Sequence, residues 1–290
     1  MTIQEGQQDL TRQLGTAYEP REAAQIADWV MENLSGLKKI DRLLHKQKRL
    51  TPEQDKLLEK YKAQLLEHTP VQYVLHEAWF YGLKLYVDEQ VLIPRPETEE
   101  LVEWVVAEVD NRQSAIGSRQ LVILDIGTGS GCIPIALKKK LPGATVYGCD
   151  VSKGALGVSR QNARNLAAAV EFLLVDFLQV DQWAVLPMAD IIVSNPPYIP
   201  VKDKATMHAN VLEHEPHLAL FVENDDPLLF YRNIARFAQG KLLPAGRIYV
   251  EIHEDLGAAT VQVFQEHGFA VVLKKDMQGK DRMIRAMKIN

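Results

Sequence analysis

The sequence predicts an α/β fold, in which a small N-terminal helical bundle precedes a doubly wound, mostly parallel sheet of seven strands. From residue 120 onward, short apolar runs alternate with helical patterns, as in β-α-β units with helices on both faces of a sheet. Only the turn-like segment 276–280 separates the last two runs, so these should pair antiparallel. Strands are predicted at 120–126, 145–149, 170–175, 189–194, 246–252, 269–275 and 282–288, and helices at 98–109, 131–140, 152–167, 227–239 and 255–267.

Residues 1–73 are predicted to form the bundle. Glu19-Pro20 begins a helix whose apolar residues recur at intervals of three and four, and Gly36 ends it. Thr51 and Gln54 have the spacing of a capping box at the start of another helix. The segment between them is also helical in pattern, and its basic residues form either a solvated face or a docking surface. Its apolar residues are Leu37, Ile40, Leu43 and Leu44, and its basic ones are Lys38, Lys39, Arg42, Lys46, Lys48 and Arg49.

Residues 74–93 are predicted to be a β-hairpin that links the bundle to a third part, residues 94–290. Two β-like runs, 78–81 and 83–87, are separated by Gly82. The next segment carries Arg95 and Glu97 among prolines, and Pro96 suits the first position of a helix. Arg95 and Glu97 either form a surface ion pair or line a site at the junction.

Composition excludes several classes of protein. A chain of 290 residues with 47% apolar residues can bury a large core. No run approaches the ~18 uncharged apolar residues needed to cross a bilayer, and the polar start is no signal peptide, so we expect a cytoplasmic protein. Cys132 and Cys149 are too few for a disulfide framework and are interpreted as reduced packing residues. The net charge of −5 argues against a long nucleic acid as the main partner.

A glycine loop follows the first strand of the predicted sheet. Gly127-Thr128-Gly129-Ser130-Gly131 precedes a helical stretch, and its glycines permit a tight turn and a close approach of a ligand to the backbone. A dinucleotide fold would place a third glycine or an alanine where this chain has Cys132, and a phosphate-binding loop would need Gly-Lys-Ser or Gly-Lys-Thr. The spacing therefore favours a ligand that lies along the loop.

Three further polar or aromatic groups follow the next strands of the sheet. Asp150 can accept hydrogen bonds from both hydroxyls of a ribose; it could instead cap a helix, although Ser152 is available for that task. Phe177 either stacks on an adenine ring, with Asp176 accepting from the adenine amino group, or is a core residue beside a solvated carboxylate. Asn195 ends the fourth strand. Because the carboxyl ends of parallel strands form the ligand-binding edge of open α/β sheets, these groups should gather at one site.

The tetrapeptide Asn195-Pro196-Pro197-Tyr198 is the strongest chemical signal. Two prolines fix two φ angles and remove two backbone donors, which leaves the Asn195 side chain and the carbonyl oxygens of Asn195 and Pro196 as a stiff array of acceptors. Such an array could hold the two N–H donors of a carboxamide or of adenine while an electrophile approaches. Tyr198 adds an aromatic wall. The simpler alternative is an ordinary turn at the end of a strand.

These motifs together resemble those of class I methyltransferases, which have a Rossmann-like sheet and use S-adenosylmethionine. The N-terminal helices and the segments 93–99, Glu215-Pro216 and 279–283 resemble, more narrowly and over nearly the whole chain, the peptide chain release factor glutamine methyltransferases. The resemblance implies methylation of the side-chain amide nitrogen of the glutamine in the Gly-Gly-Gln loop of class 1 release factors, in support of translation termination. It implies that residues 94–290 are the methyltransferase domain and that residues 1–73 recognise the substrate.

The resemblance also assigns roles to residues. Asn195 and Tyr198 would be catalytic, and S-adenosyl-L-methionine would be the co-substrate, with no metal. The cofactor would be held by Gly127, Thr128, Gly129, Ser130, Gly131, Asp150, Phe177 and Asn195, and the substrate by Asn195, Pro196, Pro197 and Tyr198. Family members often have Asp-Trp where this chain has Asp176-Phe177, and either ring can stack.

Two alternatives stay open on the sequence. An adenine amino-group methyltransferase acting on DNA or RNA would suit the same tetrapeptide, although the chain has no inserted target-recognition domain and carries negative charge. A non-catalytic binding module is the alternative of another class. His214 and His217 flank Glu215-Pro216 and are interpreted as loop residues rather than as metal ligands or bases. A monomer is the default expectation.

Overall fold

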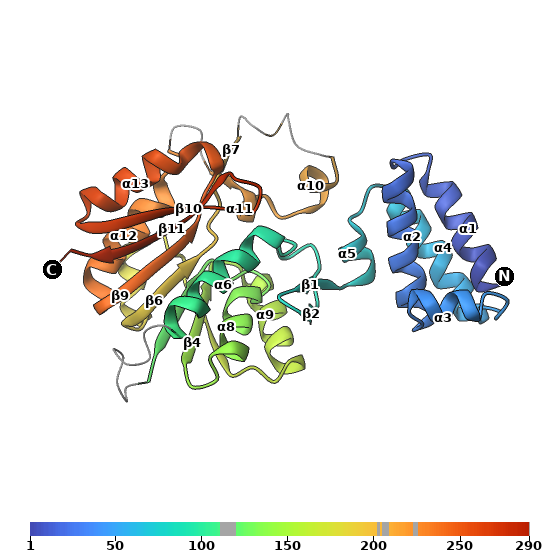
Figure 1. Cartoon of the computed structure of the whole chain (residues 1–290), viewed down its shortest axis with the longest axis horizontal. Helices are drawn as coiled ribbons and strands as arrows, with labels where there is room; N and C mark the ends of the chain where they lie inside the picture. The colour runs from blue at the N-terminus through green and yellow to red at the C-terminus, as the bar shows by residue number, and fades with distance from the viewer. Residues whose placement is uncertain (111–119, 202–203, 205–208, 223–225, 290) are drawn as a thin grey trace. The chain divides into compact units, whose positions relative to one another are not determined.

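The computed structural model describes residues 1–110, 120–201, 204, 209–222 and 226–289, which form two compact units (Figure 1). The first contains Met1–Glu77 together with the short helix α10 (Ala209–His214). The second contains the remaining described residues from Ala78 onward. No helix among the described residues is long and apolar enough to cross a membrane.

The first unit is helical. α1, α2 and α4 contact one another around a buried core that includes Leu14, Val30, Met31 and Leu65. The capping box predicted at Thr51 and Gln54 is confirmed, and Thr2 forms a second one with Glu5 that begins α1. The helices are α1 (Ile3–Leu14), α2 (Pro20–Ser35), α3 (Lys39–Leu44), α4 (Pro52–Leu66) and α5 (Val71–Leu75).

The predicted packing of α3 is wrong. Its apolar residues Ile40, Leu43 and Leu44 are exposed, whereas Arg42, expected on the surface, is buried. The Arg42 guanidinium can be buried because it donates to the Asp28 carboxylate and to the Leu37 carbonyl, which pairs its charge and gives both terminal nitrogens a partner, whereas its Nε has none within the described residues.

The second unit begins with the hairpin expected at Gly82. β1 (Ala78–Phe80) and β2 (Leu83–Leu85) pair antiparallel. Tyr81 and Gly82 form the turn, and both have positive φ, which matches the right-handed twist of the flanking strands.

The predicted sheet is confirmed. Within the described residues, seven strands form one sheet in the order β10-β11-β9-β6-β3-β4-β5. β11 is antiparallel to both of its neighbours, β10 and β9, and the other pairs are parallel. The strands are β3 (Val122–Ile126), β4 (Thr145–Asp150), β5 (Val170–Leu174), β6 (Ala189–Ser194), β9 (Leu242–Glu251), β10 (Phe269–Lys275) and β11 (Asp281–Lys288). β9 begins at Leu242, four residues before the prediction, because buried Leu242 already pairs with Ala189 of β6.

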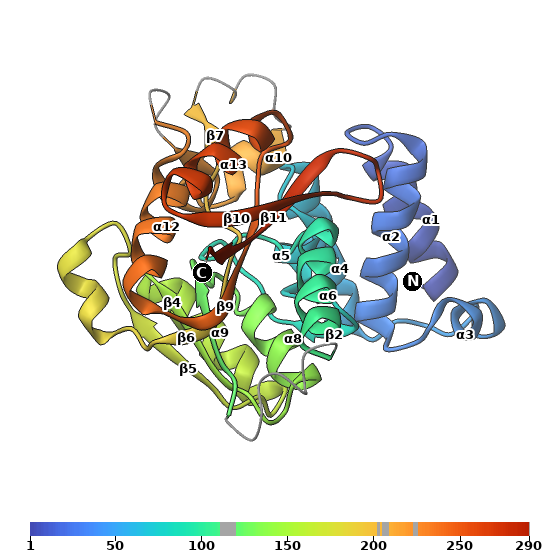
Figure 2. The ribbon, with the colours of Figure 1, turned by 60° about the vertical axis from the view of Figure 1, so that its left-hand side comes forward.

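Helices cover both faces of this sheet (Figure 1). α6 (Pro96–Asp110), α8 (Cys132–Lys140) and α9 (Lys153–Asn165) pack on one face, and α12 (Leu229–Lys241) and α13 (Gly257–Glu266) pack on the other. Figure 2 shows the long strands β10 and β11 side by side at the C-terminal end of the chain. Shorter elements complete this unit: η1 (Val180–Val185), β7 (Ile199–Pro200), α11 (His217–Leu220), β8 (Phe221–Val222) and η3 (Glu254–Leu256).

The strand order positions the site. From β3 the chain proceeds outward through β4 to β5, and then returns to the other side of β3 with β6. The order of strands therefore reverses between β3 and β6. A crevice opens outside the carboxyl ends of the strands at such a reversal, so the glycine loop after β3 and Asn195 after β6 should border it.

Candidate active site

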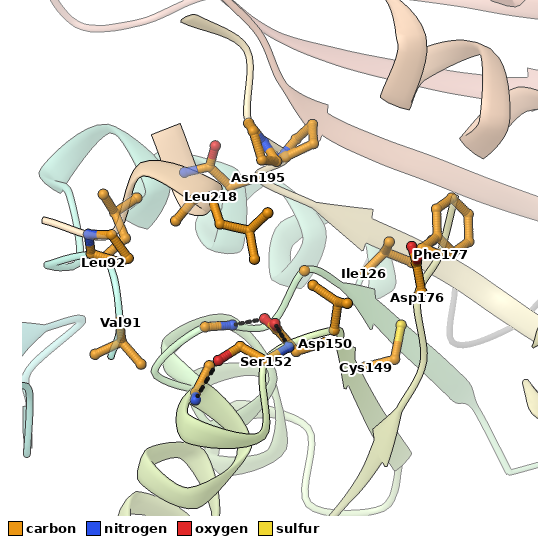
Figure 3. A pocket seen from close by; sticks show the side chains of 18 of the residues that line it. Val91, Leu92, Ile126, Cys149, Asp150, Ser152, Asp176, Phe177, Asn195 and Leu218 are labelled. Carbon is orange, nitrogen blue, oxygen red and sulfur yellow. Dashed lines mark hydrogen bonds between the residues drawn. The ribbon is translucent and has the colours of Figure 1, made fainter. Parts of the chain in front are cut away.

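A cavity of about 280 Å³ lies at this carboxyl edge of the sheet (Figure 3). Its lining includes Gly127 and Gly129 after β3, Asp150 at the end of β4, Phe177 after β5 and Asn195 after β6. Its volume is near the lower end of the roughly 300–1,000 Å³ typical of small-molecule sites. The structure thus brings together residues from four strands whose convergence the sequence predicts.

The glycine loop presents backbone to the cavity. Gly127 and Gly129 line it with φ of 74° and 52°, values that side chains rarely tolerate. Gly131 (φ 80°) packs on α9, where a Cβ would lie 3.0 Å from the Ser159 Cβ. Thr128, Ser130 and Gly131 are buried and are not among the lining residues. Of the five predicted loop residues, two therefore face the cavity directly and the other three support them.

Asp150 is held by the backbone. Its Oδ2 accepts from the Gly129 N–H and its Oδ1 from the Ser152 N–H, both at 2.9 Å (Figure 3). The Ser152 hydroxyl accepts from the Ala155 N–H at 3.1 Å, so Ser152 caps α9 as the sequence indicates. Burial raises the pKa of Asp150, and the backbone N–H donors oppose that shift. The carboxylate is fixed at the cavity wall, and each oxygen keeps a further lone pair.

Phe177 belongs both to the core and to the cavity. It is only 5% exposed, with its ring stacked on Trp183 at 5.5 Å and edge-on to Phe237 at 5.4 Å. Asp176, which also lines the cavity, accepts from the Leu178 N–H at 3.0 Å. The core interpretation of Phe177 accounts for its burial and for the position of its ring, and the residue also lines the cavity, where a ligand could contact it.

Asn195, Pro196 and Pro197 line the cavity together, and Asn195 lies across it from Asp150 (Figure 3). The Asn195 Nδ2 donates to the Thr98 hydroxyl at 3.0 Å. Within the described residues, no donor reaches the Asn195 Oδ1 or the Pro196 carbonyl oxygen. Two acceptors on a proline-stiffened segment are therefore available to a ligand.

Tyr198 is placed differently from these three residues. It is not among the lining residues; its hydroxyl donates to the Glu251 Oε1 at 3.0 Å, and its ring lies edge-on to His253. Burial raises the pKa of Tyr198, and the neighbouring Glu251 charge acts in the same direction. Tyr198 therefore contacts the protein behind the segment.

Sequence reasoning missed Thr98 and Glu251. Glu251 is 1% exposed at the end of β9, and its Oε2 accepts from the Thr98 hydroxyl at 2.6 Å. A carboxylate within the apolar run Ile248–Ile252 was a usable signal, because buried charges are rare unless they are paired. It also missed the apolar lining residues Val91, Leu92, Leu218 and Phe230.

The junction residues also find their partners. Of the two alternatives for Arg95 and Glu97, a surface ion pair or a place in a site, the first is not what the structure shows for Arg95, which pairs with buried Glu215 at 2.7 Å. The loop interpretation of two histidines is wrong, because His214 ends α10 and His217 begins α11. No group of three or more metal-ligating side chains occurs in the described part of the chain.

Comparisons with known proteins agree with this architecture. The chain matches the family models "PrmC N-terminal domain" over residues 6–75 and "Methyltransferase small domain" over residues 109–219. It is 42% identical to the release factor glutamine methyltransferase of Flavobacterium psychrophilum, over 98% of this chain and 99% of that protein. This chain belongs to the release factor glutamine methyltransferase family.

Other members of the release factor glutamine methyltransferase family are similarly close. The protein of Bacteroides thetaiotaomicron is 38% identical, over 96% of this chain and 97% of that protein. The protein of Streptococcus pneumoniae is 40% identical, over 91% of each chain. Among solved structures, the hMettl16 catalytic domain in complex with an RNA hairpin has a TM-score of 0.55 at 14% identity, covering 83% of each chain. A Pyrococcus furiosus methyltransferase has a TM-score of 0.50 at 16% identity, covering 80% of this chain and all of that one. The class I methyltransferase fold is therefore confirmed.

Proposed function

We propose that this chain transfers a methyl group from S-adenosylmethionine to the side-chain amide nitrogen of the glutamine in the Gly-Gly-Gln motif of class 1 release factors. Relatives that cover nearly the whole chain carry the name of this activity. The observation that carries the proposal is a pair of available acceptors, Asn195 Oδ1 and the Pro196 carbonyl, on two residues that line the cavity.

The residues around the cavity suit the methyl donor. Asp150 keeps lone pairs for two ribose hydroxyls, Gly127 and Gly129 let a ligand lie against the backbone, and Phe177, which also lines the cavity, would contact the adenine ring. Thr128, Ser130 and Gly131 would hold the loop in its conformation. When bound, S-adenosylmethionine supplies an electrophilic methyl group on a sulfonium.

The acceptor side addresses the weakness of the nucleophile. A carboxamide nitrogen is a poor nucleophile because its lone pair is delocalised into the carbonyl. Asn195 Oδ1 and the Pro196 carbonyl would each accept one N–H of the glutamine amide, which turns its lone pair toward the electrophile and favours a pyramidal nitrogen. The rate would come mainly from placement and from fixed dipoles that replace water. As the N–C bond forms, the S–C bond of the sulfonium would break and S-adenosylhomocysteine would leave as the neutral thioether. The nitrogen becomes acidic only as the methyl arrives, so its proton could pass to water and no strong general base is needed.

Tyr198 and the N-terminal unit complete the proposal. Tyr198 would stiffen the segment behind the amide through its hydrogen bond to Glu251. Residues 1–73 would recognise the release factor, residues 74–93 would act as a linker and residues 94–290 would carry the methyltransferase activity. The substrate places the reaction in the cytoplasm, with a monomer as the expected active form.

The test uses the purified full chain, labelled S-adenosylmethionine and a purified class 1 release factor. We expect one methyl group per release factor, mapped to the glutamine side chain of the Gly-Gly-Gln motif. The control is a release factor in which that glutamine is replaced by alanine. Methyl on another residue of the release factor, or transfer to DNA or RNA in its place, would contradict the proposal.

A further inference from the structure

We propose that Thr98 and Glu251 are positioning residues, which fix by hydrogen bonding which end of the Asn195 carboxamide faces the cavity. The inference rests on the proposed function and adds a determinant of it that lies outside the cavity. Neither residue is among those that line the cavity.

The three side chains form one continuous chain of hydrogen bonds. Asn195 Nδ2 lies 3.0 Å from Thr98 Oγ1, and Thr98 Oγ1 lies 2.6 Å from Glu251 Oε2. Thr98 is 2% exposed and Glu251 is 1% exposed, so water does not compete for these contacts. The second carboxylate oxygen, Oε1, accepts from the Tyr198 hydroxyl at 3.0 Å. Glu251 therefore holds both ends of the Asn195–Tyr198 segment.

The direction of this chain follows from proton counting. An ionised carboxylate can only accept, so the single hydroxyl proton of Thr98 must point to Glu251. The Thr98 oxygen then offers only lone pairs to Asn195, and only the amide nitrogen of Asn195 can donate to them. The carboxamide oxygen and nitrogen have nearly the same size, so hydrogen bonding alone decides between the two orientations.

The consequence reaches the substrate. With its nitrogen held by Thr98, Asn195 would have its Oδ1 left for the cavity that the residue lines, where that oxygen could accept an N–H from a glutamine amide. A reversed carboxamide would present its own NH₂ group to the NH₂ group of the substrate, and two donors cannot pair. The orientation of one amide thus separates a productive site from a blocked one.

The charge state of Glu251 sets this direction. Burial raises the pKa of Glu251, whereas hydrogen bonds from Thr98 and Tyr198 and the charge of Arg282 on β11 lower it. Glu97 on α6 adds a repulsive charge. Further titratable neighbours are Tyr231 on α12, whose hydroxyl donates to the Glu251 carbonyl, His253, whose ring contacts Tyr198, and Cys132 on α8, whose pKa is raised mainly by burial and slightly further by the Glu251 charge. When the pH falls and Glu251 takes up a proton, it can donate to Thr98, and the constraint on Asn195 is lost.

The first test compares Thr98→Val with Thr98→Ser. Valine keeps the shape and removes the hydroxyl, whereas serine keeps the hydroxyl. We expect Thr98→Val to lower kcat by about tenfold or more, a cost of about 1.4 kcal/mol, with the affinity for S-adenosylmethionine nearly unchanged. Thr98→Ser should stay within about fivefold of wild type, the range of one altered hydrogen bond.

The second test reads the orientation itself. The probe is a competitive inhibitor, a release factor whose Gly-Gly-Gln glutamine is replaced by glutamate. Its affinity reports the orientation of Asn195, because the glutamate carboxylate is repelled by Oδ1 but attracted by the NH₂ group of a reversed carboxamide. The ratio of its inhibition constant to the KM of the natural release factor should fall by about tenfold in Thr98→Val, since hydrogen bonds to charged groups are worth more than neutral ones. A loss of packing alone would not move this ratio.

The third variant, Glu251→Met, leaves the Thr98 hydroxyl in place and removes the group that directs it. Like Thr98→Val, Glu251→Met should lower kcat and should lower the ratio of the inhibition constant to KM. We expect the kcat of the wild type to fall at acidic pH, and this fall should be absent in Glu251→Met. Wild-type kcat in Thr98→Val, equal losses in Thr98→Val and Thr98→Ser, or an unchanged inhibition ratio would each overturn the proposal. A wild-type chain that binds S-adenosylmethionine but methylates no glutamine would instead end the proposed function, and this inference with it.

Discussion

The two sides of the cavity are built by different means. On the Asp150 side, backbone N–H groups of Gly129 and Ser152 hold a single carboxylate. Gly129 lies 21 positions from Asp150 in the sequence, and Ser152 lies two positions from it. On the Asn195 side, Thr98 and Glu251 hold a carboxamide through side chains alone. Thr98 lies 97 positions from Asn195 in the sequence and 153 positions from Glu251. One side depends on the local course of the chain and the other on the assembly of the whole sheet.

This difference teaches what each side can do. Backbone donors are present in every folded copy of the loop, so they give a constant environment for a ligand with a fixed structure. A relay of side chains has a direction that depends on protonation, and it can therefore select between an amide and a carboxylate. We assign the constant side to the methyl donor and the directional side to the methyl acceptor.

The largest effect should come from Asn195→Ala. It removes an acceptor that would hold the reacting amide, and comparable losses of one preorganised polar group in a catalytic site cost about 100-fold or more in kcat. The affinity for S-adenosylmethionine, measured by calorimetry, should stay within several-fold of wild type. Asn233→Ala is the matched control, because its half-buried amide bonds within α12 and lies outside the cavity, and it should keep wild-type turnover. Equal turnover in the two variants would remove the distinction between the sides.

The next effect belongs to Asp150→Ala. Removing the carboxylate frees the Gly129 and Ser152 N–H groups and deletes the proposed ribose contacts. Hydrogen bonds to charged groups are worth about 1.5–3 kcal/mol, so the dissociation constant for S-adenosylmethionine should rise by roughly 10- to 100-fold. The control is Asp181→Ala, at an exposed position in η1, which should leave the dissociation constant for S-adenosylmethionine unchanged. A loss of kcat at saturating donor with no loss of affinity would contradict the assignment.

A smaller effect concerns stability and pH. Burial raises the pKa of Glu251 above the usual range of a glutamate, so folding favours its protonated form. The contribution of Glu251 to the free energy of unfolding is then fully present below about pH 4.5, and it decreases as the pH rises through the pKa of the folded state. The free energy of unfolding of Glu251→Met, measured by urea titration, should therefore rise relative to that of the wild type as the pH increases from 4 to neutral. A difference that is flat with pH would show that Glu251 does not titrate in this range.

The smallest effect should come from Tyr198→Phe. This change removes one hydrogen bond to Glu251 and leaves the Thr98–Asn195 branch intact. The expected fall in kcat is about fivefold, corresponding to about 1 kcal/mol for one hydrogen bond. Tyr147→Phe, at a half-buried tyrosine of β4 outside the cavity, is the control. If Tyr198→Phe equalled Asn195→Ala, the ring or hydroxyl of Tyr198 would have to act on the substrate directly.

The same contrast explains how much could be predicted from the sequence. Strand positions followed from apolar runs, and the bounds predicted for 189–194 and 269–275 agree with β6 and β10 to the residue. The glycine loop, Asp150 and Asn195 could be predicted because each ends or directly follows a strand, and parallel strands bring such positions to one edge.

Features that depend on distant contacts were not found. Thr98 and Glu251 meet only after α6 packs near the end of β9, and no local pattern predicts that pairing. The burial of Arg42 is a similar case, because it depends on Asp28, which lies 14 residues earlier on another helix. Periodicity finds elements, but the pairing of polar side chains across elements is decided by the assembled fold.

The central claim is that Asn195 Oδ1 and the Pro196 carbonyl hold the two N–H groups of the glutamine amide. The most direct measurement is a crystal structure of the protein with S-adenosylhomocysteine and a Gly-Gly-Gln peptide. We predict the glutamine nitrogen at about 2.7–3.2 Å from both acceptors, with the Asn195 nitrogen still on Thr98. A glutamine nitrogen that points away from Asn195, or an Asn195 whose oxygen is turned to Thr98, would contradict the account.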